Sequence, residues 1–285
     1  MVVAGKQGAR IAVCTAPPPG SSVGALLSRW RVYRKLSQME LALRAEISTR
    51  HLSFVETGRS APSREMVLRL AEHLDLPLRE RNQLLLAAGY APMYTETALE
   101  SPGMATVRVA VRQILTGHEP YPAAAVDRDW NLVDANRGIA LFTAGAAPKL
   151  LVPPVNVLRV SLHPDGMAPR IVNLGEWRAH LLGRLRRQIA LTADHTLAAL
   201  YDELQAYPYN GPEHGVEIPA SGNIVVPLRI RHDDRELAFF STVTTFGTPL
   251  DITVAELAIE SFFPADAATA LALRNNHLPE MAGSD

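Results

Sequence analysis

Seven polar or aromatic side chains near one another in the sequence are of the types that bind DNA. Arginine can donate two hydrogen bonds to a guanine edge, and threonine or phenylalanine can contact a thymine methyl group. Candidates for contacts to bases are Thr49, Arg50, Ser53 and Phe54, and candidates for phosphate contacts are Gln38, Arg59 and Ser63. Two simpler alternatives stay open, namely that Phe54 packs against the first helix, which the pattern predicts from Ser22 onward, and that Arg50 is only solvated.

These side chains lie within a segment, residues 36–62, whose pattern predicts two short helices joined by a tight turn. Ser37 precedes Glu40 by three residues, which is the spacing of a capping box, and Ser48 can cap the second helix. Leu52 and Val55 give that helix a buried side, and Gly58 is suited to end it. This is the layout of a helix-turn-helix, whose second helix lies in the major groove.

Around this segment the sequence predicts a compact all-α domain of five helices within residues 22–90. Amphipathic patterns precede and follow the motif, and Pro77 suits the first position of the last helix. Residues 1–90 hold 13 Lys and Arg against 7 Asp and Glu, whereas residues 91–285 hold 15 against 22. A basic front and an acidic back suit a DNA-binding head joined to a body that does not bind DNA.

Residues 23–89 resemble the XRE (lambda-repressor-like) family of five-helix DNA-binding domains. The resemblance rests on Leu36-Ser37-Gln38-x-Glu40-Leu41-Ala42, on Ile47-Ser48-x-x-x-Leu52-Ser53-x-Val55-Glu56-x-Gly58-Arg59 and on Pro62-Ser63. It implies a bacterial-type regulator that binds its operator as a homodimer. Glu46 stands where the family's turn often has glycine. A non-glycine residue at positive φ costs about 1 kcal/mol, so we expect the turn to be slightly different here. We expect Glu56 to be a structural partner within the head, because a carboxylate would repel phosphates.

The second half predicts an α+β domain. Residues 123–126 suit a strand, 127–129 a turn and 131–134 a second strand, after which Asn136 can cap a helix. Two helices follow, the first with a stripe of Trp177, Leu181, Leu185 and Ile189 and the second at residues 196–206. Apolar runs at 224–230, 236–246 and 256–263 predict strands, with a hairpin turn at Asp233-Asp234, and residues 265–274 predict a closing helix.

The order strand, turn, strand, asparagine and helix resembles the start of a PAS domain. Together with NVLRVSLHPDG at 156–166, EWRAHLLGRLRRQI at 176–189 and SFFPAD at 261–266, it resembles the MmyB-like ligand-binding domain. That resemblance implies a sensor of small molecules, fatty-acid-like for some members. Candidate ligand-binding residues are Trp130, Phe142, Trp177, Tyr201, Phe240 and Phe246. Sequence does not decide whether these aromatics fill a core or line a pocket.

No pattern for catalysis, a metal or a cofactor is found, so we predict that the protein is not an enzyme. His163 with Asp165, and His232 with Asp233 and Asp234, could together hold a metal, but both groups suit turns better than a metal site. A basic cluster of Arg178, Arg184, Arg186 and Arg187 has three readings: ion pairs with nearby acids, contact with an acidic ligand head group, or a second patch facing DNA.

The predicted organisation is a disordered tail at 1–21, a helix-turn-helix domain at 22–90, a linker at 91–104, a PAS-like sensor and dimerisation domain at 105–275 and a tail at 276–285. A single cysteine, Cys14, excludes a disulfide within one chain. No apolar run reaches the length of a membrane span, so we expect a cytoplasmic protein without a membrane partner. We therefore predict a DNA-binding transcription regulator modulated by a small apolar ligand. Alternatively, the second domain only dimerises or binds a protein partner, or is an enzyme with an accessory head. A third alternative is that the head is a protein–protein adaptor with no operator.

Overall fold

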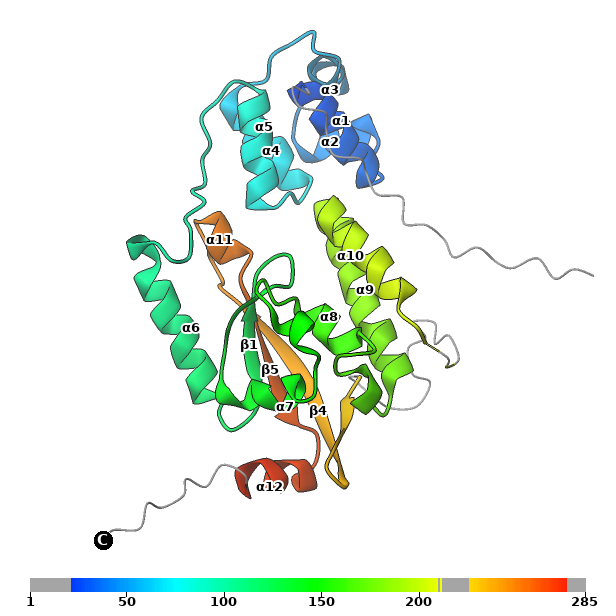
Figure 1. The fold of residues 1–285 in the computed structure, drawn as a ribbon. Coiled ribbons are helices and arrows are strands. Elements are labelled where there is room, and N and C mark those ends of the chain that lie inside the picture. The colour runs from blue at the N-terminus through cyan, green and yellow to red at the C-terminus, as the bar shows by residue number, and fades with distance from the viewer. Residues whose placement is uncertain (1–21, 210, 212–225, 276–285) are drawn as a thin grey trace, which may run out of the picture. The chain divides into compact units, whose positions relative to one another are not determined.

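The computed structural model describes residues 22–209, 211 and 226–275, which form two compact units (Figure 1). Residues 1–94 and 185–201 make the first unit, and residues 95–184 and 202–285 make the second. The predicted tails at 1–21 and 276–285, and Cys14 with them, lie outside the described residues.

Five short helices around one apolar core form the head, as the sequence predicts. They are α1 (Val23–Tyr33), α2 (Gln38–Arg44), α3 (Thr49–Glu56), α4 (Arg64–His73) and α5 (Leu78–Ala87). The capping box is confirmed, because Ser37 Oγ accepts from the Glu40 amide and Glu40 accepts from the Ser37 amide. Ser48 caps α3 through the amide of His51. Pro77 lies one residue before its predicted position, as the N-cap of α5.

All five head helices end with the same backbone motif, in which a residue of positive φ reverses the chain. Gly58 and Gly89 supply it after α3 and α5, with φ of 74° and 82°. After the other three helices Lys35, Glu46 and Asp75 adopt φ of 57°, 53° and 50°. The turn at Glu46 therefore has the same motif as the others, without the slight difference that the missing glycine led us to expect. Each turn carries the paired amide-to-carbonyl bonds that satisfy the last carbonyls of the helix.

An antiparallel sheet of five strands, in the order β2-β1-β5-β4-β3, forms the centre of the second unit. The strands are β1 (Ala123–Val126), β2 (Leu132–Ala135), β3 (Leu228–His232), β4 (Arg235–Thr245) and β5 (Ala258–Pro264). The first two match their predicted positions to within one residue, and Asp233 lies at the turn between β3 and β4 with a φ of 51°. The fold is the predicted all-α head followed by an α+β domain.

Among the residues that the structure describes, seven further helices accompany the strands. They are α6 (Ala105–Gly117), α7 (Ala140–Thr143), α8 (Val157–Leu162), α9 (Leu174–Thr192), α10 (His195–Ala206), α11 (Ile252–Ala255) and α12 (Ala267–Asn275), with short 3-10 turns at Pro102–Met104, Arg137–Ile139, Pro148–Leu151 and Ala168–Arg170. Asn136 precedes the Arg137 turn as predicted, but its side chain caps nothing there. It bonds instead to the backbone of Leu115, Tyr121 and Ala123, and so ties the end of α6 to β1.

The two faces of the sheet have different coverings (Figure 1). Side chains alternate along a strand, so Ala123 and Ala125 of β1 and Ile259 of β5 face α6 and pack with its Val111 and Leu115. The residues between them, Ala124, Val126, Glu260 and Phe262, face α7, α8 and the N-terminal half of α9. This second face holds the pocket described below.

Candidate DNA-binding face and ligand pocket

Helix α3 is held against α1 by close packing and by an ion pair. A Cβ atom at Gly24 would lie 2.3 Å from the carbonyl oxygen of Val55, so only glycine allows this approach. Arg31 donates from two nitrogens to the carboxylate of Glu56, at 2.7 and 2.9 Å. The side chains of Arg31 and Glu56 are only 12% and 3% exposed. Glu56 is therefore the structural partner that the sequence predicts.

The environment of Glu56 favours its charged form. Burial alone would raise the pKa of Glu56, but hydrogen bonds to its carboxylate from Arg31 and Gln38 outweigh burial and lower the pKa. Gln38 donates through Nε2 at 2.8 Å. Gln38, one of the candidate phosphate ligands, thus takes part in the bracing of α3 as well.

The outer face of α3 is open and basic. Thr49 and Arg50 are exposed, and Ser53 and Phe54 are half-buried. The ring of Phe54 lies beneath two guanidinium groups, those of Arg50 at 5.4 Å and Arg59 at 6.0 Å from its centroid. Such cation–π contacts restrain two long side chains on one surface. Ser63 is exposed as well, and its hydroxyl caps α4 through the Met66 amide at 3.2 Å.

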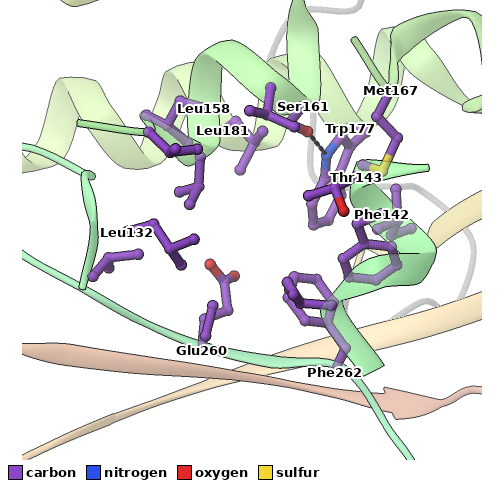
Figure 2. Close-up of a pocket in the computed structure, with 17 residues that line it drawn as sticks. Leu132, Phe142, Thr143, Leu158, Ser161, Met167, Trp177, Leu181, Glu260 and Phe262 are labelled. Atoms are coloured by element: carbon purple, nitrogen blue, oxygen red, sulfur yellow. Dashed lines mark hydrogen bonds between the residues drawn. The ribbon is translucent and has the colours of Figure 1, made fainter. Parts of the chain in front are cut away.

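A mainly apolar pocket opens between the second face of the sheet and helices α7 to α9 (Figure 2). Its empty volume is about 670 Å³, which includes the part that is open to solvent. The described residues lining it are Ala124, Val126, Leu132, Ile139, Phe142, Thr143, Val155, Val157, Leu158, Val160, Ser161, Met167, Trp177, Leu181, Leu228, Glu260 and Phe262. A concave site with few polar groups is typical of a small-molecule pocket.

Two hydrogen bonds order the polar part of this pocket. Trp177 donates from Nε1 to Ser161 Oγ at 3.0 Å, which joins α9 to α8. Arg184 of α9 donates to Glu260 Oε1 of β5 at 2.9 Å, and its guanidinium lies 4.5 Å from the centroid of the Trp130 ring. Sequence reasoning missed Glu260. The available signal was a carboxylate in the middle of an apolar strand, which requires a partner or a function.

Of the six aromatic residues predicted to bind the ligand, two line the pocket and four are not among its described lining residues. Phe142 and Trp177 line the pocket, and Phe142 contacts Phe239 and Phe262 edge to face. The other four are absent from the described lining residues. Trp130 lies under Arg184. Phe240 stacks on Phe263, which follows the lining residue Phe262 in β5 and therefore has its side chain on the other face of the sheet. Phe246 borders a more open hollow with Met104 and Leu250, and Tyr201 belongs to the first unit.

Of the three explanations for the basic cluster on α9, the first, ion pairs with nearby acids, applies to Arg184, which forms an ion pair with Glu260.

Among the described residues no group of three or more His, Cys, Asp or Glu side chains is placed to hold a metal ion. His163 accepts a hydrogen bond at Nδ1 from the Asp165 amide, which is turn chemistry. Of the helices that are described, none has the length and apolar character needed to cross a membrane.

The C-terminal end of α9 belongs to the first unit, together with the start of α10. There Tyr33 donates from its hydroxyl to the carbonyl of Ile189 at 2.9 Å, and Arg34 donates to the carbonyls of Ala190 and Leu191, each at 2.8 Å. The Ile189 carbonyl also accepts from the Ala193 amide, at 2.7 Å. Ala190 and Leu191 belong to the last turn, whose carbonyls have no partner within the helix. One continuous helix therefore carries pocket residues at one end and an α1-bound terminus at the other.

A braced helix-turn-helix with an open basic face, followed by an α+β domain with an apolar pocket, defines a class of DNA-binding transcription regulators that contain a ligand-binding domain. Comparison with family models agrees with this assignment at both ends of the chain. The model of the MmyB-like transcription regulator ligand binding domain matches residues 107–275, so the chain belongs to that family. A helix-turn-helix domain model matches residues 22–84. A comparison with curated proteins found no match.

Proposed function

We propose that the protein binds an operator as a homodimer through the head and that a small, mainly apolar ligand in the pocket changes this binding. The observation that carries the first part is the outer face of α3, where Phe54 lies beneath Arg50 and Arg59 while Glu56 is turned inward to Arg31. The head thus offers cations and hydrogen-bond donors outward and keeps its carboxylate away from phosphates.

Within this proposal Thr49, Arg50, Ser53 and Phe54 contact bases, and Gln38, Arg59 and Ser63 contact phosphates. Arg50 is exposed and restrained by a ring, which suits a bidentate contact to guanine. A homodimer follows from the geometry of such heads, which bind two inverted half-sites about one helical turn apart.

The ligand part of the proposal rests on the pocket. Its lining suits an apolar body, as the fatty-acid-like ligands implied by the family resemblance have. Helix α9 supplies Trp177 and Leu181 to the lining, and its last turn receives the hydrogen bonds of Tyr33 and Arg34. A ligand that binds better to one position of α9 would shift the population of DNA-competent molecules.

The test begins with selection of binding sequences from a randomised duplex library by the full chain. Fluorescence anisotropy with the selected duplex then compares the wild type with Arg50→Ala and with Arg235→Ala, an exposed arginine of the β3–β4 hairpin. We expect Arg50→Ala to lose ~1–3 kcal/mol of binding and its preference at one base position. Arg235→Ala should bind as the wild type does. A selection without inverted half-sites would contradict the dimer, and unchanged binding by Arg50→Ala would contradict its assignment.

A further inference from the structure

The described lining of the pocket carries one charged side chain, and its charge is negative. Among its described lining residues Glu260 is the only ionisable side chain, and Lys, Arg and His are absent from them. Ser161 and Thr143 add one hydroxyl each. From these described residues, a ligand that enters the pocket meets apolar groups, two hydroxyls and one carboxylate.

The carboxylate of Glu260 points into the open space between Leu132, Leu158 and Phe262 (Figure 2). Its Oε1 accepts the hydrogen bond from Arg184, and the described part of the chain provides no donor to Oε2. The side chain is 9% exposed, so few water molecules can reach it. Oε2 is thus an acceptor oxygen at the pocket with lone pairs to spare.

Arg184 compensates the charge of Glu260 but does not line the pocket itself. Its guanidinium is engaged by Glu260 and by the ring of Trp130. A carboxylate ligand would therefore approach Glu260 before any cation, and like charges in a poorly hydrated site repel strongly. A hydroxyl, ammonium or amide N–H would instead donate to Oε2.

We propose that the pocket selects an amphiphile whose polar head donates a hydrogen bond to Glu260, such as an alkyl alcohol or alkyl amine, over the matching carboxylic acid. This inference rests on the proposed function, because it assigns the head group of the ligand for the same pocket. The apolar body of the ligand would lie against Phe142, Leu158 and Trp177, and Ser161 offers a second polar contact near Trp177.

The test uses three eight-carbon probes that differ only in the head group: octan-1-ol, octylamine and octanoate. Binding to the full chain is measured by calorimetry and by tryptophan fluorescence, since Trp177 lines the pocket. We expect the alcohol and the amine to bind at least about tenfold more tightly than octanoate. In Glu260→Gln we expect octylamine to lose at least about tenfold in affinity and octanoate to gain affinity, because the repelling charge is removed.

Glu236→Gln is the matched control, because Glu236 is also a strand glutamate paired with an arginine, Arg229, but is exposed to solvent. It should leave the binding of all three probes unchanged. If octanoate binds the wild type most tightly, the inference about the head group is wrong, but the assignment of the pocket as a ligand site is supported. If none of the probes binds, the ligand site of the proposed function is wrong, and the inference fails with it. The wild-type series decides between these outcomes even if Glu260→Gln fails to fold.

Discussion

The head and the pocket each contain an ion pair between an arginine and a glutamate, but the two pairs differ in their role. In the head Arg31 donates two hydrogen bonds to the Glu56 carboxylate, and Gln38 donates a third. Both carboxylate oxygens are therefore hydrogen-bonded within the head, and we call this pair complete; it holds α3 against α1. In the second unit Arg184 occupies one oxygen of Glu260, and the other faces an open space. A complete pair fixes a structure, whereas an incomplete one in an apolar pocket is available to a ligand.

The largest effect expected from this comparison comes from breaking the complete pair. Glu56→Gln should destabilise the head by ~3 kcal/mol, because Arg31 is left without its charge partner in a nearly buried position. Chemical denaturation followed by circular dichroism would measure it. The exposed pair of Arg229 and Glu236 provides the contrast, since Glu236→Gln should cost less than ~1 kcal/mol.

The same pair predicts a pH dependence with a defined sign. The pKa of Glu56 is lowered in the folded head, so its contribution is complete above the unfolded pKa of ~4.3. It is lost as the pH falls through the lower, folded pKa. The difference in stability between the wild type and Glu56→Gln should therefore be largest near pH 7 and shrink below about pH 4. A difference that stays constant down to pH 3 would show that the charge of Glu56 is not responsible.

Close packing supports the brace, and Gly24→Ala tests it. The added methyl group would meet the carbonyl oxygens of Val55 and Glu56, so α3 must move away from α1. We expect a loss of ~1–3 kcal/mol of head stability, together with weaker DNA binding. Gly117 of α6 is the matched control, because it is also a helical glycine but has open space around its Cβ position. Equal losses in Gly24→Ala and Gly117→Ala would argue against the packing explanation.

The head could be predicted from sequence far more fully than the pocket, for a physical reason. Ser37, Glu40, Ser48 and Gly58 act through bonds to backbone groups within a few residues, so their spacing alone shows their role. The pocket depends on pairing between distant segments. Ala124 lies opposite Glu260 in the register of β1 and β5, and strand parity decides which aromatics face inward.

The aromatic predictions show this limit residue by residue. Phe142 and Trp177 line the pocket, but Phe240 stacks on Phe263, a neighbour of opposite parity to Phe262. Composition could not supply that distinction, because every large aromatic in an α+β domain is a candidate for burial. Similarly, a partner acid was one of three explanations left open for the arginine cluster on α9, and the sequence did not indicate that Arg184 would pair with Glu260, 76 residues later.

The proposed coupling of ligand binding to DNA binding can be tested by a substitution that leaves the DNA-binding face and the pocket lining intact. Tyr33→Phe removes the hydrogen bond to Ile189 at the end of α9 and keeps the edge contact with Trp30. We expect operator affinity without ligand to change little, while the ligand-induced change falls by ~1 kcal/mol. Tyr90→Phe is matched, because it also removes one hydroxyl-to-carbonyl bond within the head, to Pro62. Anisotropy titrations with and without the tightest-binding probe would distinguish them.

The smallest expected effect concerns the turn between α2 and α3, where Glu46 holds a positive φ of 53°. Glu46→Gly relieves a backbone strain of ~1 kcal/mol. Glycine also increases the conformational entropy of the unfolded chain, which offsets part of the gain in stability. The head should therefore become more stable by at most ~1 kcal/mol, with DNA binding retained. Asp75→Gly should behave in the same way, because Asp75 has a φ of 50° in the same helix-ending motif after α4. A gain at Asp75 without one at Glu46 would mean that the glutamate makes a compensating contribution at the turn, since the backbone geometry of the two sites is the same.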